Sequence, residues 1–268
     1  MLKISLLLIP AVLFFSTGCQ TPAGSGSGNV PSSGSLKDRI NAEILSIVPS
    51  KPRNNSVFDI YTPANNEGGW SRGWTGKIDL TGVSWDGTRT ATMVSPIHFV
   101  MARHYKRKVG DTVVFHTSKE KKVERTIVAL KELQPDIVVG LLNEKVPVTS
   151  YRVLRPSDTL AAELVGSLVF LTDGERRVHV HEIASVGGLT VQFKHSDLVH
   201  KAYWETLIAG DSSNPTFVLI KGEPVLIETH TFGGAGVGPF YSSPEIISAV
   251  NAAMLELGGG YQLKFVDP

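Results

Sequence analysis

The sequence has almost no cysteine and almost no net charge, so it lacks the means for disulfide bonding and for long-range attraction of charged partners. It contains one cysteine, Cys19, so no disulfide can form within the chain. The 26 Lys and Arg residues nearly balance the 25 Asp and Glu residues, which leaves a formal net charge of +1. This balance provides no long-range field, so no nucleic-acid partner is expected. Stability must come from a hydrophobic core, and a chain of 268 residues with 42% apolar residues can build one.

The sequence also lacks an apolar run long enough to cross a bilayer. Its longest one, residues 4–15, follows Lys3 and ends at small residues before Cys19. A positive start, a short apolar stretch and small residues predict an export signal, residues 1–18, and not a membrane span. Residues 16–19, in the order Ser-Thr-Gly-Cys, are similar to a bacterial lipobox.

The lipobox resemblance implies that the signal is removed and that Cys19 becomes the lipidated first residue. Gln20, rather than Asp, follows the cysteine, which by analogy with such signals implies the outer membrane, facing the periplasm. We therefore expect a bacterial cell-envelope lipoprotein held to the membrane by a lipid anchor at Cys19. An ordinary signal peptide with an incidental cysteine is the alternative. Residues 19–35 are uncharged and rich in Gly, Ser and Pro, which predicts a flexible linker.

Helix signals stand at both ends of the remaining chain. Ser35, with Asp38 three positions later and an apolar face behind it, predicts a helix that ends at Pro49. Near the other end, Ser243 followed by Pro and an apolar face predicts an amphipathic C-terminal helix that stops at Gly258.

Glycine and proline are frequent, at 26 and 15 residues, and they separate short apolar or alternating runs that are typical of β-strands. The runs form two sets, residues 56–62, 76–84, 88–95, 112–117, 123–132, 136–142 and 151–154, and then 163–171, 177–185, 188–194, 202–208, 215–220 and 224–232. So many short strands favour closed or nearly closed barrels. We expect an all-β protein with two six-stranded antiparallel β-barrels and a C-terminal α-helix. The first barrel, with the N-terminal helix, would occupy residues 36–155, and the second residues 156–268.

Three segments each place one reactive side chain beside an apolar strand. They are residues 94–104 with His104, residues 135–142 with Asp136, and residues 209–215 with Ser212. A serine hydroxyl becomes a good nucleophile when a neighbouring imidazole takes its proton, and a buried carboxylate fixes the tautomer of that imidazole. Gly210, two positions before the serine, allows backbone N–H groups to point at a developing oxyanion.

These segments resemble the motifs of the chymotrypsin-like (trypsin-like) serine proteases. Residues 100–104, Val-Met-Ala-Arg-His, resemble that family's Val-Thr-Ala-Ala-His stretch, and residues 136–142 resemble its Asp-Ile-Ala-Leu-Leu segment. Residues 210–212, Gly-Asp-Ser, form the core of its Gly-Asp-Ser-Gly-Gly-Pro motif, and Pro215 keeps the last place. The order His, Asp, Ser is also that of the family. The resemblance covers residues from about 56 to 257 and implies the chymotrypsin-like double barrel.

The resemblance also implies a serine endopeptidase that hydrolyses protein or peptide substrates through an acyl-enzyme intermediate, with no metal or organic cofactor. His104 would act as general base and then acid, Asp136 would orient it, and Ser212 would attack the substrate. The backbone N–H groups of Gly210 and Ser212 would form the oxyanion hole. The alternative is a catalytically inactive protease-fold lipoprotein that binds peptides or envelope partners in the same cleft.

Several residues depart from the family pattern. Ser213 and Asn214 replace the two glycines after the nucleophile, so the backbone must bend there with side chains present. Thr206 stands near the base of the primary specificity pocket, where trypsin-like enzymes carry Asp, so no preference for Arg or Lys is expected. Asp211 pairs with a freed N-terminus in relatives, a pairing that a lipidated Cys19 on a long linker disfavours.

The residues expected to contact substrate are Thr206, His230, Thr231, Phe232 and Gly233. Residues 231–233 match the family's Ser-Trp-Gly, which pairs with substrate backbone. His230 falls where glutamyl endopeptidases carry a pocket histidine, which suggests a preference for Glu; a hydrogen-bonded histidine on a core strand is the alternative. His179 and His181 alternate on one strand face, but no third metal ligand is identifiable, so we interpret them as residues of a surface strand.

Overall fold

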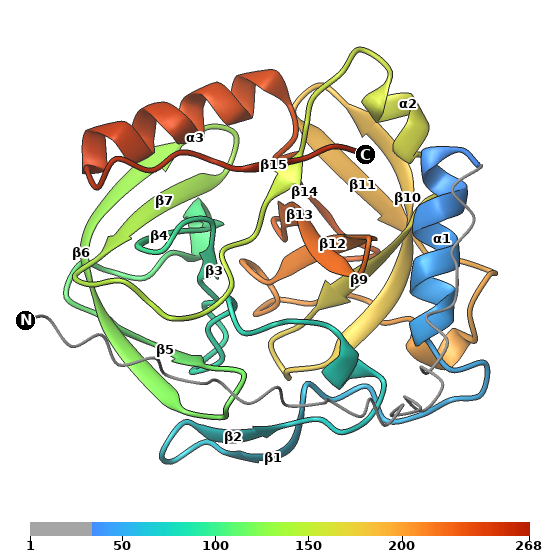
Figure 1. The fold of residues 1–268 in the computed structure, drawn as a ribbon, viewed down its shortest axis with the longest axis horizontal. Coiled ribbons are helices and arrows are strands. Elements are labelled where there is room, and N and C mark those ends of the chain that lie inside the picture. Colours follow the sequence, from blue (N-terminus) through green and yellow to red (C-terminus); the bar gives the residue numbers. More distant parts are fainter. Residues whose placement is uncertain (1–33) are drawn as a thin grey trace, which may run out of the picture.

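The fold is built on two curled sheets, which lie side by side in Figure 1. The structure, a computed structural model, describes residues 34–268, so the predicted signal peptide, the lipidation of Cys19 and most of the linker lie outside the described residues. One sheet has five strands and the other six, and neither closes on itself. The prediction of a mainly β fold with a C-terminal helix is confirmed, whereas the two six-stranded barrels are replaced by two half-barrels.

The five-stranded sheet has the order β3–β4–β7–β6–β5. Its strands are β3 (Thr92–Met93), β4 (His98–Ala102), β5 (Thr112–His116), β6 (Lys122–Leu133) and β7 (Ile137–Leu142). Every residue of β4 is buried, as its central place in the sheet requires. Phe99 on β4 lies directly against Gly140 on β7, where a Cβ atom would come within 2.0 Å of the ring. Gly140 therefore leaves the space against β7 that the Phe99 ring occupies.

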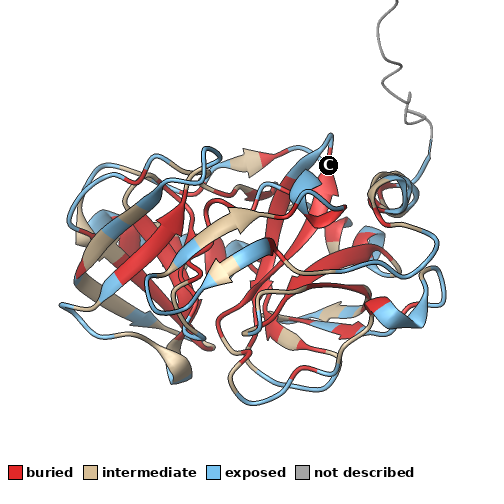
Figure 2. Ribbon diagram, turned by 90° about the horizontal axis from the view of Figure 1, so that it is seen from below, coloured by how far each residue is buried: buried red, intermediate tan, exposed pale blue. Residues whose placement is uncertain are grey.

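The six-stranded sheet has the order β13–β12–β9–β10–β11–β14. Its strands are β9 (Leu168–Thr172), β10 (Val178–Gly187), β11 (Thr190–Lys194), β12 (Pro215–Ile220), β13 (Glu223–Thr229) and β14 (Val237–Pro239). Strands β9 and β12 are buried along their whole length, which explains why they read as uninterrupted apolar runs. Figure 2 shows buried strands, in red, inside each half of the molecule.

Each long helix packs on the sheet that is remote from it in sequence. Helix α1 (Leu36–Ile47) begins at Ser35, whose hydroxyl accepts from the Asp38 N–H, as predicted. It packs against β9, β12 and the short helix α2 (Leu160–Leu164). Helix α3 (Pro244–Leu257) instead lies over β6 and β7 of the five-stranded sheet (Figure 1). Each half-barrel is therefore covered by a helix from the far end of the chain.

Two further pairs of short strands lie outside the main sheets. Strands β1 (Phe58–Thr62) and β2 (Glu67–Trp70) form an antiparallel hairpin, and β8 (Val153–Leu154) pairs in parallel with β15 (Phe265–Val266). The ring of Phe58 stacks on that of Trp70 at 4.8 Å, which holds the hairpin closed.

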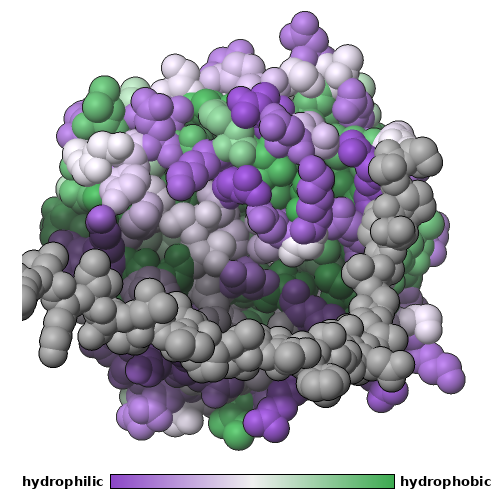
Figure 3. All heavy atoms as spheres, viewed as in Figure 1, coloured by the Kyte–Doolittle hydropathy of each residue, from purple (hydrophilic) through white to green (hydrophobic). Residues whose placement is uncertain are grey.

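Two predicted strands are absent, because side chains turn the backbone there. In residues 76–84, the Asp79 carboxylate accepts from the Thr81 N–H and hydroxyl, and a 3₁₀ turn, η1 (Thr75–Lys77), precedes it. A second 3₁₀ turn, η3 (Lys201–Tyr203), forms where the predicted strand of residues 202–208 would begin. Within residues 34–268 no helix has the length and hydropathy to cross a membrane. The face drawn in Figure 3 mixes hydrophilic and hydrophobic side chains, as exposed surfaces do.

Candidate active site

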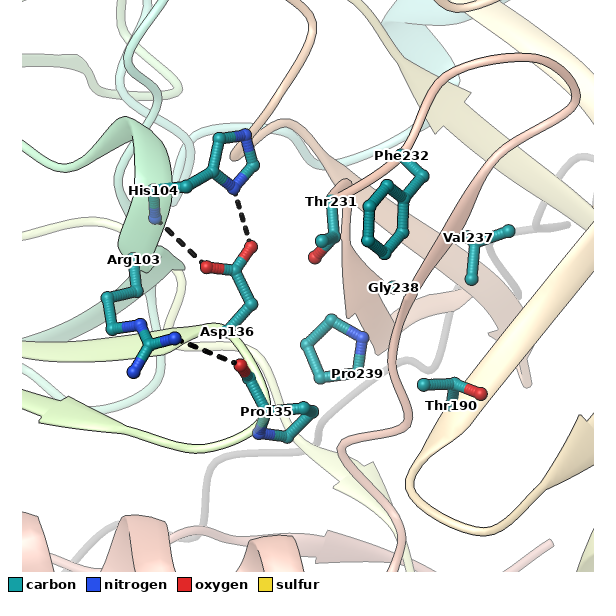
Figure 4. A pocket seen from close by; sticks show the side chains of 10 residues that line it. All are labelled: Arg103, His104, Pro135, Asp136, Thr190, Thr231, Phe232, Val237, Gly238 and Pro239. Carbon is teal, nitrogen blue, oxygen red and sulfur yellow. Dashed lines mark hydrogen bonds and ion pairs between the residues drawn. The ribbon is translucent and has the colours of Figure 1, made fainter.

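His104 and Asp136 are brought together by the pairing of β4 with β7. Ala102, at the end of β4, lies opposite Ile137 at the start of β7, so the residues just beyond these ends are neighbours. The backbone N–H of His104 donates to Asp136 Oδ1 at 2.9 Å, and its Nδ1 lies 2.6 Å from Asp136 Oδ2. Figure 4 shows both contacts. With the proton on Nδ1, the Nε2 atom is left as a hydrogen-bond acceptor.

Ser212 reaches the same histidine from the other half-barrel. It lies just before β12 in residues 208–214, which we call the Ser212 loop, and its Oγ is 2.8 Å from His104 Nε2. Asp136 is buried at 8% exposure, while the His104 side chain is 45% exposed. A continuous chain of hydrogen bonds thus runs from a buried carboxylate to a hydroxyl at the surface. The structure brings together the three residues that the sequence singled out.

The backbone of the Ser212 loop leaves the N–H groups on either side of Asp211 free. Gly210 adopts a φ of +108°, which glycine tolerates and other residues rarely adopt. The N–H groups of Gly210 and Ser212 donate to no acceptor within residues 34–268, whereas those of Asp211 and Ser213 donate to Ile208 and His230 carbonyls. These two free donors beside a serine hydroxyl are what an oxyanion hole requires.

The Asp211 carboxylate accepts two backbone N–H groups from within residues 34–268 and so fixes this loop. Its Oδ1 accepts from the Gly174 N–H at 2.9 Å and its Oδ2 accepts from the Ile208 N–H at 2.8 Å. Gly174 belongs to the turn between β9 and β10, where the buried Asp173 carboxylate accepts from Arg177 and His179. Sequence reasoning missed Gly174, because the only signal there, an Asp-Gly pair, marks a turn and says nothing of its partner.

A pocket of about 360 Å³ opens beside His104. Its lining, drawn in Figure 4, consists of Arg103, His104, Pro135, Asp136, Thr190, Thr231, Phe232, Val237, Gly238 and Pro239. Phe232 is 68% exposed, an unusual state for a large apolar side chain. Two of the predicted substrate-binding residues, Thr231 and Phe232, therefore line a cleft that also includes His104 and Asp136.

The backbone next to this pocket offers unpaired hydrogen-bonding groups. The N–H groups of Thr231 and Phe232 both donate to the Val237 carbonyl, which closes a tight hairpin. The Thr231 carbonyl and both backbone groups of Gly233 have no partner within the described residues. The segment 231–233 is therefore an exposed edge to which an extended peptide can add as a further strand.

The two side chains proposed for a deep specificity pocket do not meet there. Thr206 is exposed at the surface. His230 is 1% exposed, its Nε2 lies 3.0 Å from the Thr172 carbonyl oxygen, and its Nδ1 lies 2.6 Å from Glu228 Oε1. Burial lowers the pKa of His230, but the Glu228 carboxylate, the Thr172 carbonyl and the Asp211 carboxylate together outweigh it and raise the pKa above the ordinary value. His230 thus occupies the interior behind the cleft, as in the core-strand alternative.

His179 and His181 are buried on β10, so their interpretation as residues of a surface strand is wrong. His179 Nε2 lies 2.8 Å from the Asp173 carboxylate, and His181 Nδ1 lies 2.8 Å from the Ala235 carbonyl oxygen. Burial lowers the pKa of His181 to about 4. Among residues 34–268 no group of three or more His, Cys, Asp or Glu side chains is arranged to hold a metal ion.

Comparison with known proteins adds no assignment, since neither a protein-family model nor a curated protein matches the chain.

Proposed function

We propose that the protein is a serine endopeptidase of the chymotrypsin-like kind, acting on protein or peptide substrates. The observation that carries this proposal is the hydrogen-bonded chain from Asp136 through His104 to Ser212 Oγ, with contacts of 2.6 and 2.8 Å. Side chains in this order and at these distances are suited to acyl transfer. Two half-barrels of five and six strands that contribute to one site are consistent with a double-barrel protease fold.

In the proposed reaction, His104 Nε2 takes the Ser212 proton as Oγ attacks the substrate carbonyl carbon. The N–H groups of Gly210 and Ser212 stabilise the resulting oxyanion, each such donor being worth about 10²–10³ in rate. His104 then gives its proton to the leaving amine, and the carbon–nitrogen bond breaks to leave an acyl-enzyme. Water, deprotonated by His104, attacks the ester and releases the carboxylic acid, which restores Ser212.

The substrate in this proposal is an extended peptide bound along residues 231–233. The free Thr231 carbonyl and the Gly233 N–H and carbonyl supply backbone hydrogen bonds that do not depend on substrate sequence. The pocket beside His104, with Phe232, Val237 and Pro239 on its walls, favours an apolar substrate side chain. The proposed address is the bacterial envelope, with a lipid at Cys19 holding the chain to the outer membrane on its periplasmic side.

The competing proposal is a protease-like fold that binds peptides and does not cleave them. The exposed edge at residues 231–233 would serve that function equally well. The two are separated by whether Ser212 is a reactive nucleophile, because binding alone requires only the edge.

Labelling with a fluorophosphonate, which reacts with activated serines, tests the proposed function. We expect the wild-type protein to be labelled, and Ser212→Ala and His104→Ala to lose the label. Ser118→Ala, at an exposed turn serine, is the matched control and keeps it. Circular dichroism establishes that each variant is folded. A folded wild-type protein that takes no label and cleaves no peptide of a mixed library contradicts the enzyme proposal and favours the binding one.

A further inference from the structure

Ser212 and His104 belong to different half-barrels, so their 2.8 Å contact depends on how the Ser212 loop is joined to β4. The loop is tied to its own half by Asp211, which accepts from Gly174. A second contact must connect the Ser212 loop to the five-stranded half-barrel, which contains His104, because a misplacement of reacting groups by about 1 Å lowers the rate.

Ser213 supplies that contact. Its Oγ accepts from the backbone N–H of Ala102 at 3.0 Å, and the residue is 0% exposed. Ala102 ends β4, two positions before His104, and Ser213 directly follows Ser212. One hydrogen bond therefore joins the strand that delivers the base to the loop that delivers the nucleophile.

The backbone at Ser213 indicates that its hydroxyl has a role. Ser213 has a φ of +78°, a left-handed conformation that glycine adopts freely and serine does not. A glycine at position 213 would remove this strain but would leave the Ala102 N–H buried without an acceptor. Retention of a strained side chain in a packed interior is expected where the side chain does something that glycine cannot.

Asn214 makes a second, parallel connection. Its Oδ1 accepts from the Thr90 hydroxyl at 3.0 Å, and its Nδ2 donates to the Asp211 carbonyl at 3.1 Å. Thr90 and Asn214 are each 1% exposed, so both bonds are shielded from water. Asn214 thereby connects the segment before β3 to the backbone of the Ser212 loop.

We propose that Ser213 is a positioning residue: its hydroxyl couples the Ser212 loop to β4 and so holds Ser212 Oγ within reach of His104 Nε2. This inference rests on the proposed function. Asn214 supports the same junction from the next position. The role differs from that of a merely structural hydrogen bond, whose loss would lower stability while leaving the rate per folded molecule unchanged.

Two substitutions separate the hydroxyl from the strain. Ser213→Gly removes both, whereas Ser213→Ala removes the hydroxyl and keeps the strained conformation. Ser196→Ala is the matched control, because Ser196 is also buried, at 1% exposure, and its Oγ also accepts from a backbone N–H, that of Leu198. For each variant, kcat and KM on a cleaved peptide, the fluorophosphonate labelling rate and the thermal unfolding midpoint are measured.

We expect Ser213→Gly to unfold near the wild-type temperature and to lose about 10- to 100-fold in kcat and in labelling rate, with KM within about threefold. Ser213→Ala loses as much rate and is also less stable, while Ser196→Ala keeps its kcat. A Ser213→Gly variant with wild-type kcat and labelling rate overturns the positioning role and leaves the proposed function intact. A folded wild-type protein without labelling or cleavage overturns the proposed function, and the positioning role with it.

Discussion

Leu207 and Gly234 exchange both backbone hydrogen bonds, at 2.8 and 3.0 Å, and so join the segment before the Ser212 loop to the tight hairpin of residues 231–237. Leu207 is 3% exposed, and a Cβ added at Gly236 would lie 3.2 Å from its Cδ1 atom. A Cβ added at Gly233 would come within 2.6 Å of the Leu207 carbonyl oxygen. In the proposed protease, these two segments would flank the side chain of the residue whose carbonyl is attacked, at a place distinct from the pocket beside His104. Their direct pairing leaves little space between them for a large side chain.

This closure predicts selectivity for a small residue at the cleaved bond. We expect peptides with Gly, Ala or Ser at the attacked carbonyl to be cleaved at least about tenfold faster than those with Phe, Lys or Glu. Leu207→Ala should relax the selectivity, since it frees space beside Gly236, at a cost of about 2–5 kcal/mol in the free energy of unfolding. Mass spectrometry of a digested peptide mixture measures the cleavage selectivity of the wild-type protein and of Leu207→Ala.

The control for this selectivity is Leu198→Ala, the same truncation at a side chain that is 53% exposed. It should leave the cleavage pattern unchanged. Rapid cleavage after Glu by the wild-type protein would show that His230 does reach the substrate, contrary to its buried position.

A second prediction concerns Asp211, whose carboxylate is satisfied by the N–H groups of Gly174 and Ile208. Because both oxygens already have donors, a tag placed before the mature N-terminus should leave the labelling rate unchanged. Asp211→Ala leaves the N–H groups of Gly174 and Ile208 without their acceptor and should slow labelling by at least about tenfold. Loss of activity on blocking the terminal amine would mean that a freed N-terminus, not Gly174, completes the site.

A third prediction follows from the pKa of His181, which burial lowers to about 4 from the ordinary value of 6.5. The folded state holds His181 neutral, while the unfolded state takes up a proton as the pH falls below about 6.5. The contribution is thus fully present above pH 6.5 and is lost progressively between about pH 6.5 and 4, amounting to roughly 3 kcal/mol.

Urea unfolding of the wild-type protein and His181→Asn at pH 7.5, 6 and 4.5 isolates this contribution. Asn can donate to the Ala235 carbonyl in place of Nδ1 but does not titrate. We expect the difference in unfolding free energy between the two proteins to shift in favour of His181→Asn as the pH falls. Parallel pH dependences would show that His181 does not change protonation on unfolding.

A fourth prediction contrasts two neighbouring ion pairs. The Arg107 and Asp86 side chains are 11% and 6% exposed and 2.6 Å apart, and burial raises the pKa of Asp86 although Arg107 opposes this. Arg107→Ala leaves that carboxylate buried alone and should cost about 3 kcal/mol or more. Lys106→Ala, which removes an exposed pair with Glu132, should leave the midpoint of the same thermal unfolding measurement nearly unchanged, because solvent screens such pairs.

The cluster of His104, Asp136 and Ser212 could be predicted from the sequence because a short local pattern marks each of the three residues. His104 and Asp136 stand at the ends of apolar strands, and Ser212 lies between Gly210 and Pro215. Strand ends are marked by residues a few positions apart, so reading along the chain suffices. The register of β4 with β7, Ala102 opposite Ile137, then brings two of the three together.

The rest depends on contacts that no local pattern encodes. The bond between Ser213 and Ala102 joins residues 111 positions apart, and nothing near Ser213 identifies its partner. The first part of β10 is buried on both faces, since Val178 and Val180 are buried as well as the two histidines that alternate with them. What covers the second face is remote in sequence, so the alternation could not reveal this burial. The incomplete closure of the sheets likewise depends on strand pairing over long distances.

Each long helix covers the sheet that is remote from it in sequence, and this arrangement has a consequence for how the chain folds. Asn41 on α1 donates to the Gly166 carbonyl and accepts from the Leu168 N–H, 125 and 127 positions later. Helix α3 covers β6 and β7, which precede it by more than a hundred residues. The five-stranded half-barrel lacks its covering helix until the last segment of the chain is present. Both helices make contacts of large sequence separation, so assembly should be slow. A chain that stops before α3 should expose the face of β6 and β7 that α3 covers, and should aggregate even though it contains His104, Asp136 and Ser212.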